Sequence, residues 1–347
     1  YLDARILILD EPTAVLTPDE SARLFRILGQ MRAQGLSILL ISHKMSEVLQ
    51  ADRVTVLRDG MVVGSQPRGE MTKADLARMM VGREVTLQPE KPAITPGAVR
   101  LEVHDLWAQN DMGVAALQGV SLAVHTGEIL GLAGVSGNGQ RELAEVINGL
   151  RPVTKGQVLL EGKDITSAPT AELIPSGLAY IPEERMRDGM IKDFTVAENL
   201  ILRDHHRLPY ARAGFFDFKA IAQTAAERIR AFRIKTPSQE TLAKSLSGGN
   251  IQKIILAREL SRDPHVIIAA QPTRGLDIGA MEYVHQRLLQ ERARVLQAER
   301  KDGAAILLIS EDLDEILALS DRIAVMYEGR IMGILERAEA TPERLGL

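Results

Sequence analysis

The feature that most constrains this chain is an internal duplication with a long period. Residues 38–64 read ILLISHKMSEVLQADRVTVLRDGMVVG, and residues 306–333 read ILLISEDLDEILALSDRIAVMYEGRIMG. A second matched pair lies upstream of each copy, ILILDEPTAVL at 6–16 and VIIAAQPTRGLD at 266–277. The copies are offset by about 260 to 270 positions, which suits a duplicated domain and is too long for a solenoid repeat. The pattern therefore predicts two copies of one fold.

The two copies differ in how much sequence precedes their Pro-Thr pair. The second copy starts near Arg100, whereas the first has eleven residues before Pro12. We therefore expect roughly 160 residues of a first domain to be absent from this chain. The intervening LQPEKPAITPGAVR contains three prolines and is typical of a semi-rigid linker. The predicted organisation is the remnant of a first domain over 1–87, a linker over 88–99 and a second domain over 100–347.

The local pattern predicts α/β structure with a mostly parallel sheet. Ile6–Leu9 is a continuous apolar run, as expected of a strand buried on both faces. Thr17-Pro18-Asp19-Glu20 resembles a capping box, and Gly35 is placed to end the helix that follows. That helix is predicted to bury one face, which comprises Leu24, Ile27, Leu28 and Met31.

Strands and hairpins complete the prediction. A second strand is expected over 37–42. Asp59-Gly60 and Glu328-Gly329 each lie between short alternating runs, which indicates a hairpin in both copies. The longest apolar runs are strand-sized and fall short of the ~18 residues that a membrane span needs.

Two carboxylates follow the first predicted strand directly. Asp10 and Glu11 come at its carboxyl end, and His43 ends the neighbouring strand. This arrangement suits hydrolysis of a magnesium-bound nucleotide, with Asp10 in the Mg²⁺ shell and Glu11 orienting and deprotonating the attacking water. His43 is placed to reach a γ-phosphate. The alternative is a solvated carboxylate pair with a structural histidine.

A serine and two glycines open a predicted helix in the second copy. Ser247, Gly248, Gly249 and Asn250 precede the apolar residues Ile251, Ile254 and Ile255. The first backbone N–H groups of such a helix have no partner within the helix, and the positive end of the helix dipole lies at the same end. The pattern therefore predicts an anion site there. A flexible turn is the alternative.

A second glycine-rich loop follows the apolar run 129–133. Its candidate phosphate-binding residues are Gly134, Ser136, Gly137, Asn138, Gly139, Gln140 and Arg141. The glycine spacing is that of a phosphate loop, but Gln140 stands at the lysine position and Arg141 at the hydroxyl position. A neutral amide forfeits a charge-assisted contact of ~1.5–3 kcal/mol, so we expect a weak nucleotide site that does not hydrolyse, or a purely structural turn.

Three further substitutions distinguish the second copy. Ala270 and Gln271 replace the carboxylate pair, and Glu311 replaces the histidine. Together they remove the Mg²⁺ ligand, the base and the γ-phosphate contact, so the second half is predicted to be catalytically inactive.

Charge and cysteine content exclude other classes. The 42 basic and 46 acidic residues give a net charge of −4, which argues against a nucleic-acid partner held by bulk charge. The absence of cysteine excludes disulfides and thiolate sites and fits a reducing compartment.

Taken together, LSGGN, LILDEPTAVL, ISHKMSEV and PTRGLD resemble the ATP-binding-cassette (ABC) family, specifically the tandem ATPases of bacterial importers for nucleosides and simple sugars. The resemblance implies a P-loop, RecA-like ATPase core with antiparallel β and helical subdomains, in tandem. It assigns Asp10 and Glu11 to Walker B, His43 to the switch histidine, Gly134–Arg141 to a degenerate Walker A and Ser247–Asn250 to the signature. Glu183 falls at the Q-loop position and Asp277 at the D-loop aspartate.

The resemblance also implies partners and a location. Two cassettes pack head to tail, so the Walker B of the first copy faces the signature of the second across ATP and Mg²⁺. Membrane permease subunits dock on the region 186–242, with a substrate-binding protein beyond, which places the protein on the cytoplasmic face of the inner membrane. Because no lysine-bearing phosphate loop is present in this sequence, we expect the chain as given to hydrolyse ATP poorly or not at all. A non-transport ABC ATPase and a non-catalytic binding module are the alternatives.

Overall fold

The computed structural model describes residues 4–13, 16, 18–42, 44–58, 60–85, 89–294 and 303–346. The chain divides into two compact units. Unit 1 comprises Tyr1–Gln88 with Gly275–Tyr283, and unit 2 comprises Pro89–Arg274 with Val284–Leu347. The domain boundaries expected from the sequence, at 87/88 and 99/100, remain a prediction.

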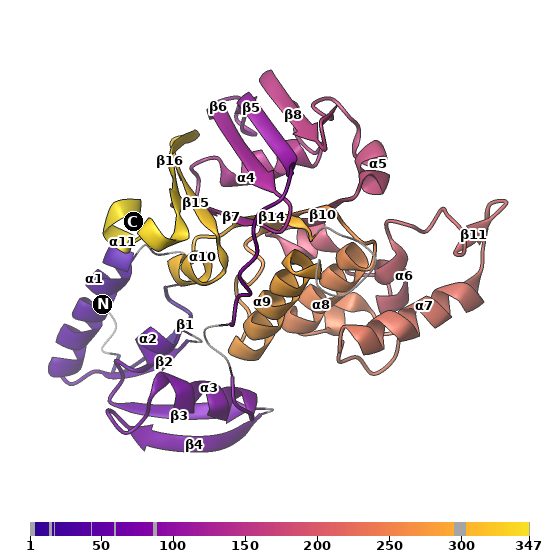
Figure 1. Ribbon diagram of the computed structural model, residues 1–347. Coiled ribbons are helices and arrows are strands. Elements are labelled where there is room, and N and C mark those ends of the chain that lie inside the picture. The colour runs from indigo at the N-terminus through magenta and orange to yellow at the C-terminus, as the bar shows by residue number, and fades with distance from the viewer. Residues whose placement is uncertain are drawn as a thin grey trace. The chain divides into compact units, whose positions relative to one another are not determined.

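A six-stranded sheet forms the centre of unit 2 (Figure 1). Its strands, in spatial order, are β10 (Leu178–Ile181), β13 (Val266–Ala270), β14 (Ala305–Ile309), β7 (Ile129–Ala133), β15 (Arg322–Tyr327) and β16 (Arg330–Glu336). All neighbours pair in parallel except β15 and β16, which form the predicted hairpin across Glu328-Gly329. Strands β7, β10, β13 and β14 are buried along their whole length, as continuous apolar runs predict.

A second, antiparallel sheet covers one side of this core. It contains β5 (Val99–Gln109), β6 (Ala115–His125), β8 (Lys155–Leu160) and β9 (Lys163–Asp164). Residues from both sheets and from α4 (Gln140–Ile147) form one hydrophobic cluster, which includes Leu106, Leu117, Leu132, Leu143 and Leu307. Burial of this apolar surface is the main force that holds the two sheets together.

Helices form the rest of unit 2. They include α5 (Thr170–Leu173), α6 (Val196–Ile201), α7 (Phe218–Ala231), α8 (Gly248–Leu260) and α10 (Leu313–Leu319), with α11 (Pro342–Leu345) at the end. A short hairpin of β11 (Ala211–Arg212) and β12 (Phe215–Phe216) lies between α6 and α7. Helix α9 (Ile278–Arg292) begins in unit 1, where Arg83 Nη2 lies 2.5 Å from a carboxylate oxygen of Glu282.

Unit 1 contains the same local elements as the end of unit 2. Strand β1 (Ile6–Asp10) pairs in parallel with β2 (Ser37–Ile41), and β3 (Arg53–Arg58) pairs with β4 (Met61–Pro67) in a hairpin. Both hairpins shift register at the equivalent place, after Val56 and after Val325. Helices α1 (Pro18–Ala33), α2 (Met45–Val48) and α3 (Lys73–Val81) complete the unit. The repeat seen in the sequence is therefore also a structural repeat.

Two predictions for unit 1 were wrong in detail. Ile6 and Ile8 of β1 are 66% and 63% exposed, so this strand is not buried on both faces. Ile6 and Ile8 lie on the same face of the strand, and no element among the described residues covers that face. Along α1 only Leu28 of the predicted face is buried, while Ile27 and Met31 are exposed.

Other predictions hold. Helix α1 begins at Pro18 and ends before Gly35, whose φ of +94° is the left-handed conformation that glycine favours. Thr17 of the predicted capping box lies outside the described residues. Within the part of the chain described here, no helix has the length and apolar character required to cross a bilayer.

Candidate functional site

The two predicted carboxylates lie at the carboxyl end of β1. Asp10 is the last residue of the strand, and Glu11 follows it with a φ of +45°. The Glu11 N–H donates to the Ile41 carbonyl oxygen at 2.8 Å, which fixes this turn against β2. Both residues are exposed. His43 lies outside the described residues.

The second copy repeats the same turn with different chemistry. Gln271 follows β13 with a φ of +47°, and its N–H donates to the Ile309 carbonyl oxygen at 2.8 Å. Its amide oxygen accepts from the N–H of Glu311 at 3.3 Å. The residues that replace the carboxylate and the histidine therefore lie together, and only the first copy has two carboxylates at this turn.

A buried glutamate supports the carboxylate turn in unit 1. The Glu47 carboxylate accepts hydrogen bonds from Thr13 Oγ1 and, at 2.7 Å, from Ser42 Oγ. Lys44 Nζ lies 3.6 Å from Glu47 and donates to the Thr13 carbonyl oxygen at 3.1 Å. These contacts tie the loop after β1 to the loop after β2, so the ends of both strands are held at one edge.

Ser247 is the N-cap residue of α8. Its carbonyl oxygen accepts the N–H groups of Asn250 and Ile251, both at 3.0 Å, and Asn250 Nδ2 donates to its hydroxyl at 2.9 Å. Ser247 and Gly248 are exposed, and Gly249 is half-buried. Helix α8 is 13 residues long, with a buried body from Ile251 onward and an exposed amino end. This end can bind an anion through its N–H groups and its dipole.

Arg185 adds a positive charge beside this helix end. A Cβ on Gly248 would lie 3.2 Å from Arg185 Nη1, so the glycine lets the guanidinium approach the backbone. Arg185 lies in a π-helical turn over Arg185–Gly189, and burial lowers the pKa of its guanidinium. The sequence analysis did not single out Arg185, because no local motif places it next to Gly248.

The phosphate-type loop after β7 is closed by its own side chains. Gln140 Oε1 accepts from the Asn138 N–H at 3.1 Å, and Gln140 Nε2 donates to the Val135 carbonyl oxygen at 3.0 Å. Gly134 packs so closely that a Cβ there would lie 2.7 Å from Gln140 Nε2. The Gln140 amide thus satisfies the loop's own backbone, and no ammonium group is present to bind phosphate oxygens.

The β15–β16 hairpin holds this loop from outside. The Glu328 N–H donates to Asn138 Oδ1 at 2.7 Å, and the Gly329 N–H donates to the Asn138 carbonyl oxygen at 2.9 Å. Gly139 fits against the Ala116 carbonyl oxygen, 2.5 Å from where its Cβ would lie. Val135, Ser136 and Gly137 at the tip of the loop are exposed, and a Cβ on Gly137 would meet open space.

Arg141 and Glu183 belong to a charged cluster near the same loop. Arg141 Nε donates to Glu145 at 2.7 Å, so its guanidinium is committed to an ion pair where a hydroxyl would reach Mg²⁺. Glu183 follows β10 and pairs with Arg274. Burial raises the pKa of the Glu183 carboxyl, and the nearby Glu311 raises it further, while Arg274 opposes the shift.

Parallel strands place these residues at one edge of the unit 2 sheet. Gly134, Glu183, Gln271 and Glu311 all follow the carboxyl ends of their strands. The structure therefore brings together the degenerate loop and the residues that replace the catalytic set. Arg274 was not predicted, because its partner Glu183 is 91 positions away in the chain.

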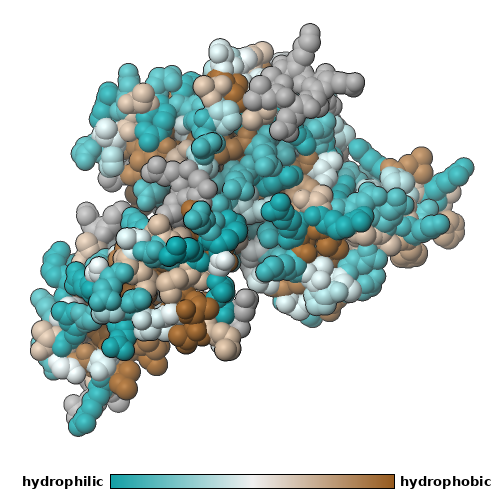
Figure 2. All heavy atoms as spheres, turned by 60° about the horizontal axis from the view of Figure 1, so that its bottom comes forward, coloured by the Kyte–Doolittle hydropathy of each residue, from teal (hydrophilic) through white to brown (hydrophobic). Residues whose placement is uncertain are grey.

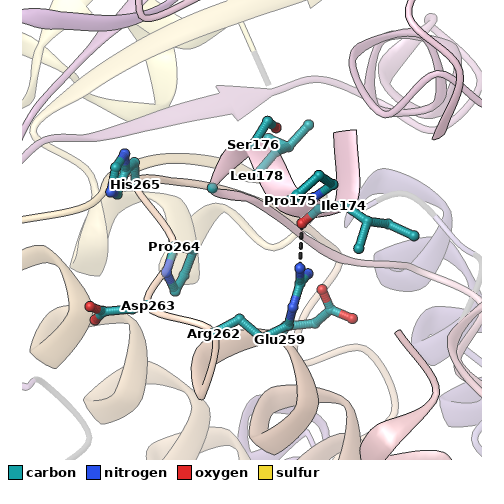
Figure 3. Close-up of a pocket in the computed structure, with 10 residues that line it drawn as sticks. Ile174, Pro175, Ser176, Leu178, Glu259, Arg262, Asp263, Pro264 and His265 are labelled. Atoms are coloured by element: carbon teal, nitrogen blue, oxygen red, sulfur yellow. Dashed lines mark hydrogen bonds between the residues drawn. The ribbon is translucent and has the colours of Figure 1, made fainter. Parts of the chain in front are cut away.

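A pocket lies at the opposite edge of this sheet (Figure 3). It has a volume of about 260 Å³ and lies beside Gly177, Pro264 and His265, just before β10 and β13. Arg262 crosses it and donates to the Ile174 carbonyl oxygen. None of the predicted site residues lines it, so this pocket is separate from the motifs.

Comparisons with known proteins agree with this geometry. A sequence profile described as ABC transporter matches residues 117–274. The nucleoside import ATP-binding protein NupA of Lactococcus lactis is 44% identical over 348 residues, which is 100% of this chain and 67% of that protein. The glucose import ATP-binding protein of Haloferax volcanii is also 44% identical, over 100% of this chain and 62% of its own length.

A solved structure shows the same fold. The crystal structure of a nucleotide-free ATP-binding cassette from an ABC transporter superposes with a TM-score of 0.58 at 24% identity, covering 72% of this chain and 99% of that one. The predicted fold class, an ABC ATPase core with antiparallel β and helical parts, is confirmed.

Proposed function

Since this chain belongs to the ABC transporter family, among its import ATP-binding subunits, we propose that it contributes the catalytic carboxylates and a signature to an ATP-hydrolysing subunit that energises the uptake of a nucleoside or a simple sugar. The observation that carries the proposal is the matched turn after β1 and β13. Both copies hold it in the same conformation, and only the first places two exposed carboxylates on it.

The roles of the first copy follow from its chemistry. Carboxylate oxygens are the ligands that Mg²⁺ prefers, so Asp10 would hold the ion, which neutralises phosphate charge when bound. Glu11 would accept the proton of the attacking water, and His43 would donate to the γ-phosphate. The Glu11 backbone is fixed by its bond to Ile41, so little reorganisation is needed to orient the carboxylate.

The second loop is proposed to be non-catalytic. Gln140 is held by Val135 and Asn138, and Arg141 is paired with Glu145, so neither fits a magnesium-bound triphosphate. The second copy would instead contribute Ser247, Gly248, Gly249 and Asn250 to the ATP bound by the first copy. This head-to-tail pairing of the two copies is part of the proposal and rests on the family resemblance.

The proposed partners are membrane permease subunits and a substrate-binding protein, with the subunit on the cytoplasmic face of the inner membrane. The names of the relatives include both a nucleoside importer and a glucose importer at equal identity, so the transported solute stays open between these two classes.

Crosslinking tests the pairing directly, because the chain contains no cysteine. We expect Glu11→Cys with Ser247→Cys to be joined by a short bismaleimide in the assembled transporter when ATP is trapped, and not without nucleotide. Glu11→Cys with Lys163→Cys, on the exposed strand β9, is the matched control and should not be joined. Absence of the Glu11–Ser247 product in the trapped state would overturn the proposed arrangement.

A further inference from the structure

An exposed apolar arm projects from unit 2 between α6 and α7 (Figure 1). We define the Phe arm as residues 205–219, with the β11–β12 hairpin at its end. Leu208, Phe215, Phe216 and Phe218 are 74%, 80%, 51% and 75% exposed. Three of the six phenylalanines in the chain are therefore exposed to solvent within the segment 215–218. Such a cluster of exposed apolar side chains is unusual on a globular surface and indicates an interaction site.

The Phe arm is anchored to a folded base. Tyr210 is buried with Ile201 and Ile221 in a small hydrophobic cluster. The Asp217 N–H donates to the Tyr210 carbonyl oxygen at 2.8 Å, and Asp217 caps α7 by accepting from the Ala220 N–H. The phenylalanines are thus presented by an ordered hairpin. The rings of Phe216 and Phe218 meet edge to face, with their centroids 6.3 Å apart.

Positive charge surrounds these apolar side chains. Arg207, Arg212 and Lys219 are exposed on the Phe arm itself. The Phe arm holds these three basic residues against one acidic residue, Asp217, a formal charge of +2 in a chain whose net charge is −4. Figure 2 shows hydrophobic and hydrophilic residues side by side on the projecting arm. Exposed aromatic side chains within a basic patch are complementary to an anionic lipid surface.

We propose that the Phe arm is a membrane-contact element, which inserts its phenylalanine side chains among the headgroups of an anionic phospholipid bilayer while the flanking basic residues bind the phosphates. The area buried at the tip is small, so electrostatic attraction must add to apolar insertion for binding to be measurable. The inference goes beyond the proposed ATPase function and does not depend on nucleotide.

Vesicle cosedimentation of the whole chain tests the proposal. We expect binding to vesicles of mixed phosphatidylglycerol and phosphatidylcholine, little binding to phosphatidylcholine alone, and release by high sodium chloride. Phe215→Ser with Phe216→Ser should abolish binding, and Arg212→Gln should weaken it roughly fivefold, as expected from ~1 kcal/mol for each basic residue near such a surface.

Matched control variants distinguish binding by the Phe arm from nonspecific binding by other exposed apolar or charged side chains. Met112→Ser with Val114→Ser removes exposed apolar side chains from another hairpin, and Lys163→Gln removes an exposed charge elsewhere. Both should bind like the native chain. An unchanged thermal unfolding midpoint in all variants shows that loss of binding is not loss of folding.

Fluorescence distinguishes insertion from adsorption. Trp107 is the only tryptophan, so Trp107→Phe with Phe215→Trp places a single reporter on the arm. Its emission should shift to the blue with anionic vesicles and be quenched by brominated acyl chains. Failure to bind anionic vesicles, equal binding by the Phe variants, or binding to detergent-solubilised permease but not to lipid would overturn the proposal. None of these outcomes bears on ATP hydrolysis.

Discussion

Thr273 and Glu315 are joined by a buried hydrogen bond of 2.8 Å between the threonine hydroxyl and the carboxylate. The Nε2 atom of His285 lies 2.8 Å from the same carboxylate oxygen. Thr13 and Glu47 make the equivalent contact in the first copy. The threonine of each Pro-Thr pair thus ties the loop after one strand to the helix after the next. This contact is retained in the copy that has lost its carboxylates, so its role is to hold the edge of the sheet.

Thr273→Val should destabilise unit 2 by about 1–3 kcal/mol, because the substitution removes a donor from a buried carboxylate. The other oxygen of Glu315 has no hydrogen-bond partner among the described residues, so the carboxylate would keep only its side-chain contact with His285. Urea unfolding measures the change in free energy. Thr154→Val, at an exposed threonine, is the control and should change stability by less than about 0.5 kcal/mol.

Gln140→Lys should strengthen nucleotide binding at the degenerate loop. A lysine there would restore a charge-assisted contact to phosphate, and we expect the Kd for ATP at this loop to fall roughly ten- to a hundredfold. Titration with a fluorescent ATP analogue measures the effect. Gln140→Met loses the same contacts with Val135 and Asn138 but adds no charge, so it should show no gain. Equal affinity in the lysine and methionine variants would mean that the missing charge does not limit this loop.

Arg185→Gln should weaken the anion site at the start of α8. The guanidinium lies beside Gly248, so its loss removes a positive charge from the end that the signature serine caps. In the assembled transporter we expect the KM for ATP to rise roughly tenfold, from loss of ~1.5 kcal/mol, with partial rescue by Arg185→Lys. Arg187→Gln, whose side chain pairs with Asp188 in the same turn, is the control. A rise of equal size in the control would show that the π-helical turn itself, rather than Arg185, is responsible.

The elements that were predictable from sequence are those set by local periodicity. Residues 129–133 and 266–270 are apolar throughout and form buried strands, and Glu328-Gly329 forms the turn of a hairpin. Because the sequence repeats, the same strands and hairpin were predicted in both copies. Helix α8 was predictable because a serine N-cap precedes residues at helical spacing.

Features that depend on distant parts of the chain were not predictable. Ile6–Leu9 has the same apolar pattern as Val266–Ala269, yet β1 is exposed on one face, because burial depends on which elements cover a strand. Arg185 beside Gly248 and Arg274 beside Glu183 are likewise tertiary contacts with no local signal. The glycine spacing predicts the loop after β7. It does not predict that Gln140 and Asn138 close this loop, because their partners include the distant residue Glu328.

Glu183 should make the stability of unit 2 depend on pH. Burial raises the pKa of its carboxyl above the ordinary value of 4.5, so the folded state holds this proton to a higher pH than the unfolded state does. The resulting stability is fully present below the unfolded pKa and is lost as pH rises through the folded pKa. Glu183→Gln removes this dependence, so the stability of the variant relative to the native chain should increase as the pH rises above 4.5 in urea unfolding. Arg274→Gln should make the loss of stability with rising pH larger than in the native chain, because Arg274 lowers the pKa of Glu183. A native chain whose stability difference from Glu183→Gln is constant across this range would show that the carboxyl is not desolvated.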